Sequence, residues 1–209
     1  HRMAQEMLAG VGGVRAVRAY CRLTGTPAPE VFHTNEGHAG FLGLERMREL
    51  AADGLSFDEA LAGVRAGTVF TTHTPVPAGI DRFAKDLVRS YYEQPEWAAL
   101  PVERVLELGS ETDPGRFNMA HMGLRLAQRA NGVSKLHGVV SREMFQPLWP
   151  GFDVEEVPIT SITNGVHAPT WMCRELLEIV DRNGTDGTDA LLQEASGWQA
   201  LDKVPDEEL

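Results

Sequence analysis

Short strand-forming segments alternate with longer helical segments along the first third of the chain. Residues 31–33 and 68–72 are rich in β-branched and aromatic side chains and predict strands. Helices are predicted over residues 2–23, 38–52 and 56–66, the second from apolar residues that recur at helical spacing. Strands that are separated by helices usually pair in parallel. The chain is therefore expected to adopt an α/β fold with a parallel sheet.

Turn and cap signals extend this interpretation to the rest of the chain. Ser56 with Glu59, and also Asn118, are typical of residues that cap the start of a helix. The glycine-rich run 10–13 is expected to interrupt the first helix, and the polar, proline-containing segment 93–115 to form a surface excursion. Further helices are predicted over 101–108, 118–130, 139–146, 170–181 and 189–200, and further strands over 133–136 and 157–162.

Two histidines follow predicted strands, at the edge where parallel α/β sheets bind ligands. His33 and His73 both stand at carboxyl-terminal strand ends. The run from His33 to His38 places polar side chains in a strand-to-helix turn. It fits a helix cap, a metal site or a polar ligand site, although its histidine spacing differs from that of two ligands on one helix face.

His73 lies within the hydroxyl-rich turn 71–77. Threonine hydroxyls, an imidazole ring and backbone groups offer the mixed donors and acceptors that sugar hydroxyls need. A buried histidine satisfied by neighbouring hydroxyls would give the same pattern. The residues by themselves leave both interpretations open.

Composition narrows the choice of partners. The formal net charge of -11 argues against nucleic acid or an anionic membrane as the main partner. No apolar run reaches the roughly 18 residues of a membrane helix, and no secretory signal is visible. Cys21 and Cys173 stand in no CxxC pattern, so free thiols in a reducing compartment are expected. The run 10–13 lacks the GxGxxG spacing of a dinucleotide site. Because the chain begins at His1 and stops at Leu209 within an acidic stretch, we expect a piece of a longer chain.

Six motifs, taken in order, resemble the α-glucan phosphorylases and in particular their bacterial branch. Each motif alone is weak, whereas six in order over nearly the whole chain are specific. They are Gln5-Glu6 with the run 10–15, HTNEGHA (33–39), FTTHTPVPAG (70–79), NMAH (118–121), NGVSKLH (131–137) and ITNGVH (162–167) followed by Thr170-Trp171.

The resemblance implies a GT-B glycosyltransferase fold, in which two Rossmann-like domains face each other across a cleft. Residues 1–164 would be the later part of the N-terminal sugar-binding domain. Residues 165–209 would be the domain junction and the incomplete start of the C-terminal domain. The resemblance also implies a reaction in which inorganic phosphate removes the terminal glucose of an α-1,4-glucan as glucose 1-phosphate, with retained anomeric configuration.

The family's cofactor is pyridoxal phosphate, held by a lysine as a Schiff base, and its phosphate group takes part in proton transfer. Lys135 and Lys203 match neither that lysine nor the basic residues that bind substrate phosphate. We therefore expect the attachment lysine outside this chain, and no activity from the chain alone. The resemblance further implies a cytoplasmic, homo-oligomeric and allosterically regulated parent enzyme.

The resemblance assigns His73 as the catalytic-site histidine. In the family this residue contacts the glucose through its side chain and backbone carbonyl, and can stabilise the positive charge that develops on the sugar ring. Thr74 follows it in the Thr-His-Thr motif and is expected to bind substrate. Asn164 matches an asparagine that hydrogen-bonds a sugar hydroxyl.

The resemblance places Asn35, Glu36 and His38 in a loop that lines the sugar pocket, whereas Asp81 replaces a family glutamate. Two other functions stay open at this point. A metal-dependent hydrolase would use His33, His38 and Glu36, although we expect no bound metal. A non-catalytic glucan-binding module would share the fold without a cofactor domain.

Overall fold

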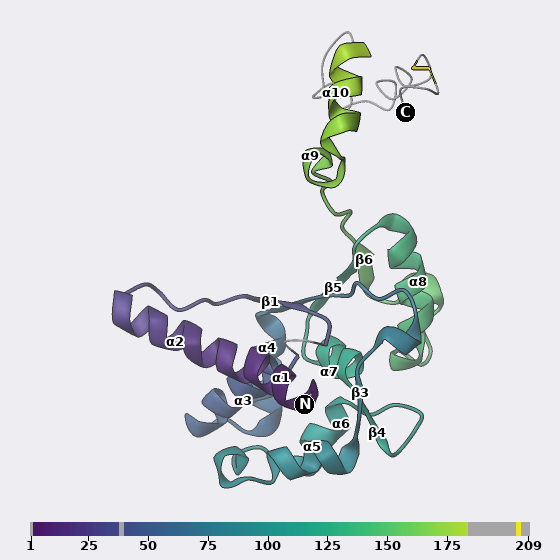
Figure 1. Cartoon of the computed structure of the whole chain (residues 1–209). Coiled ribbons are helices and arrows are strands. Elements are labelled where there is room, and N and C mark those ends of the chain that lie inside the picture. Colours follow the sequence, from purple (N-terminus) through teal and green to yellow (C-terminus); the bar gives the residue numbers. More distant parts are fainter. Residues whose placement is uncertain (1, 38–39, 184–203, 206–209) are drawn as a thin grey trace. The chain divides into compact units, whose positions relative to one another are not determined.

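The computed structural model describes residues 2–37, 40–183 and 204–205 (Figure 1). The chain divides into two compact units, His1–Thr163 and Asn164–Leu209. The strands and most of the helices belong to the first unit.

The second unit contains two described helices, α9 (Ala168–Trp171) and α10 (Arg174–Asn183). One helix was predicted across this region, and the structure divides it in two. The helix predicted over 189–200 lies outside the described residues. Along the described parts of both units, no helix is long and apolar enough to cross a membrane.

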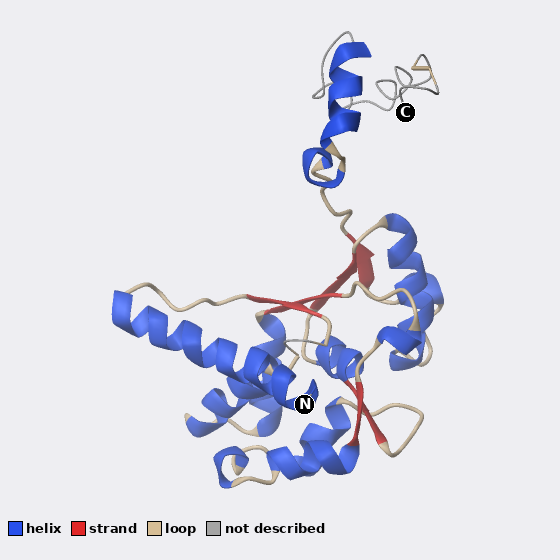
Figure 2. Ribbon diagram, viewed as in Figure 1, coloured by secondary structure: helices blue, strands red, loops and turns tan. Residues whose placement is uncertain are grey.

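The first unit is built on a four-stranded parallel sheet in the order β1-β2-β5-β6 (Figure 2). Its register pairs Asn35 with Thr71 and Thr71 with Asn131, so three carboxyl-terminal strand ends meet along one edge. This sheet confirms the predicted α/β fold with a Rossmann-like parallel arrangement. The strands are β1 (Phe32–Asn35), β2 (Thr68–Thr71), β5 (Arg129–Gly132) and β6 (Ile159–Ser161).

The predicted interruption of the first helix at the glycine-rich run takes the form of a π-helical turn. α1 (Arg2–Met7) passes through a π-helical turn (Leu8–Gly12) directly into α2 (Gly13–Thr24). A Cβ atom on Gly10 would lie 2.7 Å from the backbone nitrogen of Leu42. Gly10 therefore permits close packing against the start of α3 (Leu42–Ala52). The glycine-rich run forms a π bulge, and the helical path continues through it.

The remaining helices of the first unit confirm the predicted caps. The Ser56 side chain accepts the Glu59 backbone N–H, while the Glu59 carboxylate accepts the Ser56 N–H at 2.8 Å. The Asn118 side chain accepts the His121 N–H at 3.0 Å. The helices are α3 (Leu42–Ala52), α4 (Phe57–Ala66), α5 (Lys85–Tyr92), α6 (Val102–Leu108), α7 (Met119–Arg125) and α8 (Lys135–Phe145). Single 3-10 turns lie at Pro77–Gly79, Pro95–Trp97, Gln146–Leu148 and Val154–Glu156.

The strand predicted over 133–136 is wrong, because the strand precedes that segment as β5. The Ser134 side chain accepts the His137 N–H at 3.0 Å, so it caps α8, which begins at Lys135. The preceding helix is correspondingly shorter than predicted. It ends at Arg125, which leaves residues 129–132 for the sheet.

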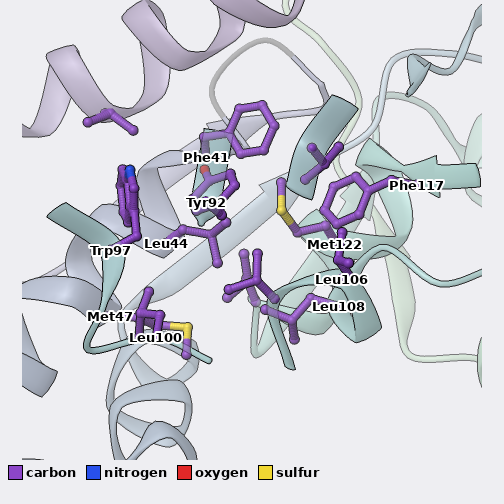
Figure 3. Close-up of a cluster of buried hydrophobic side chains, with 14 of the residues drawn as sticks. Phe41, Leu44, Met47, Tyr92, Trp97, Leu100, Leu106, Leu108, Phe117 and Met122 are labelled. Carbon is purple, nitrogen blue, oxygen red and sulfur yellow. The ribbon is translucent and has the colours of Figure 1, made fainter. Parts of the chain in front are cut away.

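The segment 93–115 is not a surface excursion. Trp97, Leu100 and Val105 are all buried, and they pack in an apolar cluster with Phe41 and Phe117 (Figure 3). An antiparallel pair that the sequence did not indicate, β3 (Arg82–Ala84) with β4 (Arg116–Asn118), joins the chain on either side of residues 85–115. We refer below to the buried residues Phe41, Leu44, Met47, Tyr92, Trp97, Leu100, Leu106, Leu108, Phe117 and Met122 as the apolar cluster.

Candidate functional site

A relay of hydrogen bonds crosses three strands just before the carboxyl edge of the sheet. The Thr71 hydroxyl on β2 donates to the Asn131 Oδ1 atom on β5 at 2.9 Å. Since its one proton is used there, the hydroxyl accepts from His33 Nε2 on β1 at 2.7 Å. His33 thus lies inside β1 and not at its end, so the prediction that placed it at the strand terminus is wrong. Its Nε2 atom ties β1 to β2.

The turn after β2 is held by a carboxylate from the loop after β1. The Thr72 hydroxyl donates to Glu36 Oε2, and the Thr74 hydroxyl donates to Glu36 Oε1. The Glu36 N–H donates to the Thr71 carbonyl at 3.0 Å, which continues the parallel pairing by one residue. Thr72 is 0% exposed, so its hydroxyl contacts only protein.

A second brace reaches the same turn from α8. The His137 Nδ1 atom accepts the Val133 N–H at 3.1 Å, so the ring proton must lie on Nε2. Nε2 then donates to the Thr74 carbonyl at 3.2 Å. His137 is buried and was not singled out from the sequence, although it ends the NGVSKLH motif. The sequence carried no signal for this role, because no spacing relates His137 to a turn 63 residues away.

His73 stands between these two braces and is exposed. Its Nε2 atom lies 3.3 Å from Asn35 Oδ1, at the end of β1. Among the described residues this is its single side-chain hydrogen bond, so imidazole and amide groups remain for a bound molecule. An exposed His-Asn pair at the carboxyl edge of a parallel sheet offers both donors and acceptors to a polyhydroxylated ligand.

A cavity of about 100 Å³ lies beside the turn. Gly37, at φ +70°, adopts the left-handed conformation at its wall, and a Cβ there would lie 3.2 Å from Asp81 Oδ2. The cavity is lined by Arg2, Glu36, Gly37, Thr74, Gly79, Ile80, Asp81 and Ala120.

Two residues that line this cavity, Arg2 and Asp81, form an ionic cluster with Glu6. Arg2 donates to Asp81 at 2.7 Å and to Glu6 at 3.0 Å. Burial, followed by the hydrogen bond to Asp81 and its negative charge, raises the pKa of Glu6 to about 8, although Arg2 lowers it in part. The raised pKa favours the neutral acid form of Glu6 at pH 7.

The structure brings together four of the predicted site residues: Asn35, Glu36, His73 and Thr74. His38 lies outside the described residues. Asn164 belongs to the second unit and is described with that unit alone. Its role, like those of the other site residues, stays a prediction.

The geometry does not favour the hydrolase interpretation. Both Glu36 oxygens accept threonine hydroxyls, and His33 is bonded within the sheet. Over the described ranges, no group of three His, Cys, Asp or Glu residues is placed to hold a metal ion.

The described lysines do not fit a Schiff-base site for pyridoxal phosphate. Lys135 is exposed on the first turn of α8, and Lys85 is half-buried at the start of α5. A lysine that forms such a bond is typically desolvated or placed beside another cation so that its amine is neutral. These two residues lack that burial, so we assign no cofactor contact to them.

Fold and site together give an α/β unit whose carboxyl edge presents hydrogen-bond donors and acceptors of the kind that a hydroxyl-rich molecule requires. No protein-family model matches the chain. Over 98% of its length it is 58% identical to glycogen phosphorylase from Mycobacterium tuberculosis, of which it covers 24%. It is 41% identical to maltodextrin phosphorylase from Thermococcus litoralis over 100% of the chain and 24% of the relative. It is 36% identical to glycogen phosphorylase from Aquifex aeolicus over 85% of the chain and 26% of the relative.

Along nearly its whole length the chain is thus similar to a segment of the α-glucan phosphorylases. It spans about a quarter of the length of the curated relatives it matches. The six motifs that carried the resemblance all lie inside the matched region.

Proposed function

We propose that this chain carries part of the sugar-binding half of the active site of an α-glucan phosphorylase. The reaction is transfer of the terminal α-1,4-linked glucose to inorganic phosphate, which gives glucose 1-phosphate. The observation that carries the proposal is the 58% identity to a glycogen phosphorylase over 98% of the chain. The exposed His73–Asn35 pair at the carboxyl edge of the sheet provides groups that suit the glucose unit.

Within this proposal His73 is the catalytic residue. Its imidazole and backbone carbonyl face the glucose and stabilise positive charge on the ring as the glycosidic bond breaks. Asn35, Thr74, His38 and Asn164 hydrogen-bond sugar hydroxyls.

The proposal also covers what the complete polypeptide adds. Residues 1–164 form the later part of the N-terminal domain of a GT-B fold, and residues 165–209 the junction with the C-terminal domain. Pyridoxal phosphate supplies a phosphate group for proton transfer when bound, held by residues outside this chain. Cytoplasmic location, a homo-oligomeric state and allosteric control follow from the same family interpretation.

An assay of the complete polypeptide tests the proposal. We expect glucose 1-phosphate to form from maltodextrin only when inorganic phosphate is supplied, and the isolated chain to release none and to bind no pyridoxal phosphate. A polypeptide that binds maltodextrin but forms no glucose 1-phosphate would instead be a glucan-binding module. Hydrolysis to free glucose that depends on a metal would favour the hydrolase.

A further inference from the structure

The residues around His73 are held far more firmly than His73 itself. Within the described part of the chain its imidazole makes one hydrogen bond, at 3.3 Å, and the side chain is exposed. By contrast, Thr72 and Thr74 each donate a hydroxyl to Glu36, and the Thr74 carbonyl accepts from His137. The position of the imidazole is therefore decided by the main chain of the turn 72–74.

The two braces approach this turn from different strands. Glu36 follows β1, and His137 lies on α8 just after β5. Both side chains thus fasten the central turn to its two neighbours in the sheet. The Thr72 N–H adds a backbone bond to the Asn131 carbonyl at 3.0 Å, so the turn starts from a fixed point on β5.

We propose that Glu36 and His137 are positioning residues, which hold the turn 72–74 so that His73 faces the substrate in a productive orientation. This inference rests on the proposed phosphorylase function and changes the role of Glu36. A carboxylate is an acceptor only, and both Glu36 oxygens already accept a threonine hydroxyl. In this inference Glu36 acts on the reaction through the turn that its two oxygens hold.

Positioning of this kind has a large effect on turnover. A displacement of about 1 Å at a reacting group can lower a rate by about 10²-fold. A buried brace can therefore matter as much as a substrate contact while it touches no substrate.

Thr72 provides the cleanest test, because its hydroxyl is buried and cannot reach a ligand. In the complete polypeptide, we expect Thr72→Val to lower kcat about tenfold or more with a much smaller change in KM for maltodextrin. Thr72→Ser keeps the hydroxyl and should restore kcat. The matched control is Thr68→Val, which removes a buried hydroxyl at the start of β2, the strand that Thr72 directly follows, and should lower Tm without changing kcat.

His137 provides a second, independent pair of variants. A glutamine amide can place a donor near the position of the ring Nε2 atom, so His137→Gln keeps the bond to the Thr74 carbonyl. An asparagine amide reaches only the position of Nδ1, so His137→Asn keeps the bond to Val133 and loses the brace on the turn. We expect kcat to stay within about threefold of wild type in His137→Gln and to fall about tenfold or more in His137→Asn.

The outcomes separate this inference from the proposed function. A wild-type polypeptide without phosphorolysis contradicts the function itself. Phosphorolysis that is lost in His73→Ala but normal in both Thr72→Val and His137→Asn overturns the positioning role alone. Equal kcat losses in His137→Gln and His137→Asn, in step with equal losses of Tm, show a merely structural histidine and also overturn it. If Thr72→Val does not fold, the His137 pair decides.

Discussion

The carboxyl edge of the sheet and the apolar cluster each bury side chains, but with different kinds of contact. At the edge, Thr72 and Asn131 bury polar atoms that each have a named partner. In the cluster, Phe41, Tyr92 and Phe117 bury rings that meet at centroid distances of 5.8 and 6.4 Å. Hydrogen bonds fix direction, whereas ring packing fixes mainly volume. The comparison teaches that the cluster maintains the fold while the edge aims one side chain.

The largest effect on stability is expected from truncation within the apolar cluster. Phe117→Ala should lower the free energy of unfolding by about 3–5 kcal/mol, because the ring is fully buried and leaves a cavity. Urea titration measures this change. Phe152→Ala, at a side chain that is 47% exposed, is the matched control and should change stability by less than about 0.5 kcal/mol. Equal losses of stability at both positions would contradict the view that burial in the cluster is what makes Phe117 important for stability.

At the edge, the largest expected effect is on turnover and not on stability. His73→Ala should lower kcat by about 10²–10³-fold and leave Tm unchanged, because the side chain is exposed. For Asn164→Ala we expect both kcat and KM to worsen, with the larger change in kcat. Steady-state kinetics on folded variants, checked by circular dichroism, measure these changes. Wild-type kinetics in both variants would refute their assignment to the site.

Two glycines in the continuous helical segment 2–24 test how strongly close packing affects stability. Gly10→Ala should lower the free energy of unfolding by about 1–3 kcal/mol, since the new methyl group would meet the Leu42 backbone at 2.7 Å. Gly13→Ala, where no atom lies within 4 Å, should stabilise the helix by about 0.5–1 kcal/mol. Thermal unfolding of the two variants tests the difference. The same shift in Tm for both would show that the π-helical turn Leu8–Gly12 and α3 do not approach closely.

A pH titration tests the ionic cluster of Arg2, Asp81 and Glu6. Because the pKa of Glu6 is about 8 in the folded chain against an ordinary value of 4.5, the folded state binds the extra proton between these pH values. Stability should therefore fall as pH rises from 4.5 to 8, by up to about 1.4 kcal/mol per pH unit. Glu6→Gln stays neutral and should flatten that slope. An unchanged slope in the variant would mean that Glu6 titrates normally.

The smallest effect is expected from a hydroxyl inside the apolar cluster. The Tyr92 hydroxyl meets only the Met7 sulfur, at 3.3 Å, and burial raises the pKa of Tyr92 well above its usual value. Since a thioether is a weak acceptor, Tyr92→Phe should change the free energy of unfolding by less than about 0.5 kcal/mol. Thr72→Val removes the same kind of group at the edge and should affect kcat instead. A large loss of stability in Tyr92→Phe would contradict the view that the cluster depends on volume alone.

Local features of the fold could be predicted from the sequence because their causes lie within a few residues. The caps at Ser56 and Asn118, the strand ending before His73 and the α/β alternation each depend on neighbours along the chain. The same holds for the motifs that identified the family. These features needed no knowledge of which distant segments meet.

Only the tertiary structure decided the roles of residues that act over long separations. His137 holds a carbonyl 63 residues away, and Gly10 owes its importance to a backbone approach by Leu42. Trp97 looked exposed in a polar, proline-containing segment, yet it packs on Tyr92 with ring centroids 4.7 Å apart. Such contacts leave no period or spacing in the sequence, because a hydrogen bond or a close approach depends on where the folded chain returns. The motif around His73 could therefore be recognised from the sequence. The contacts of Glu36 and His137 that hold its turn appear only in the folded structure.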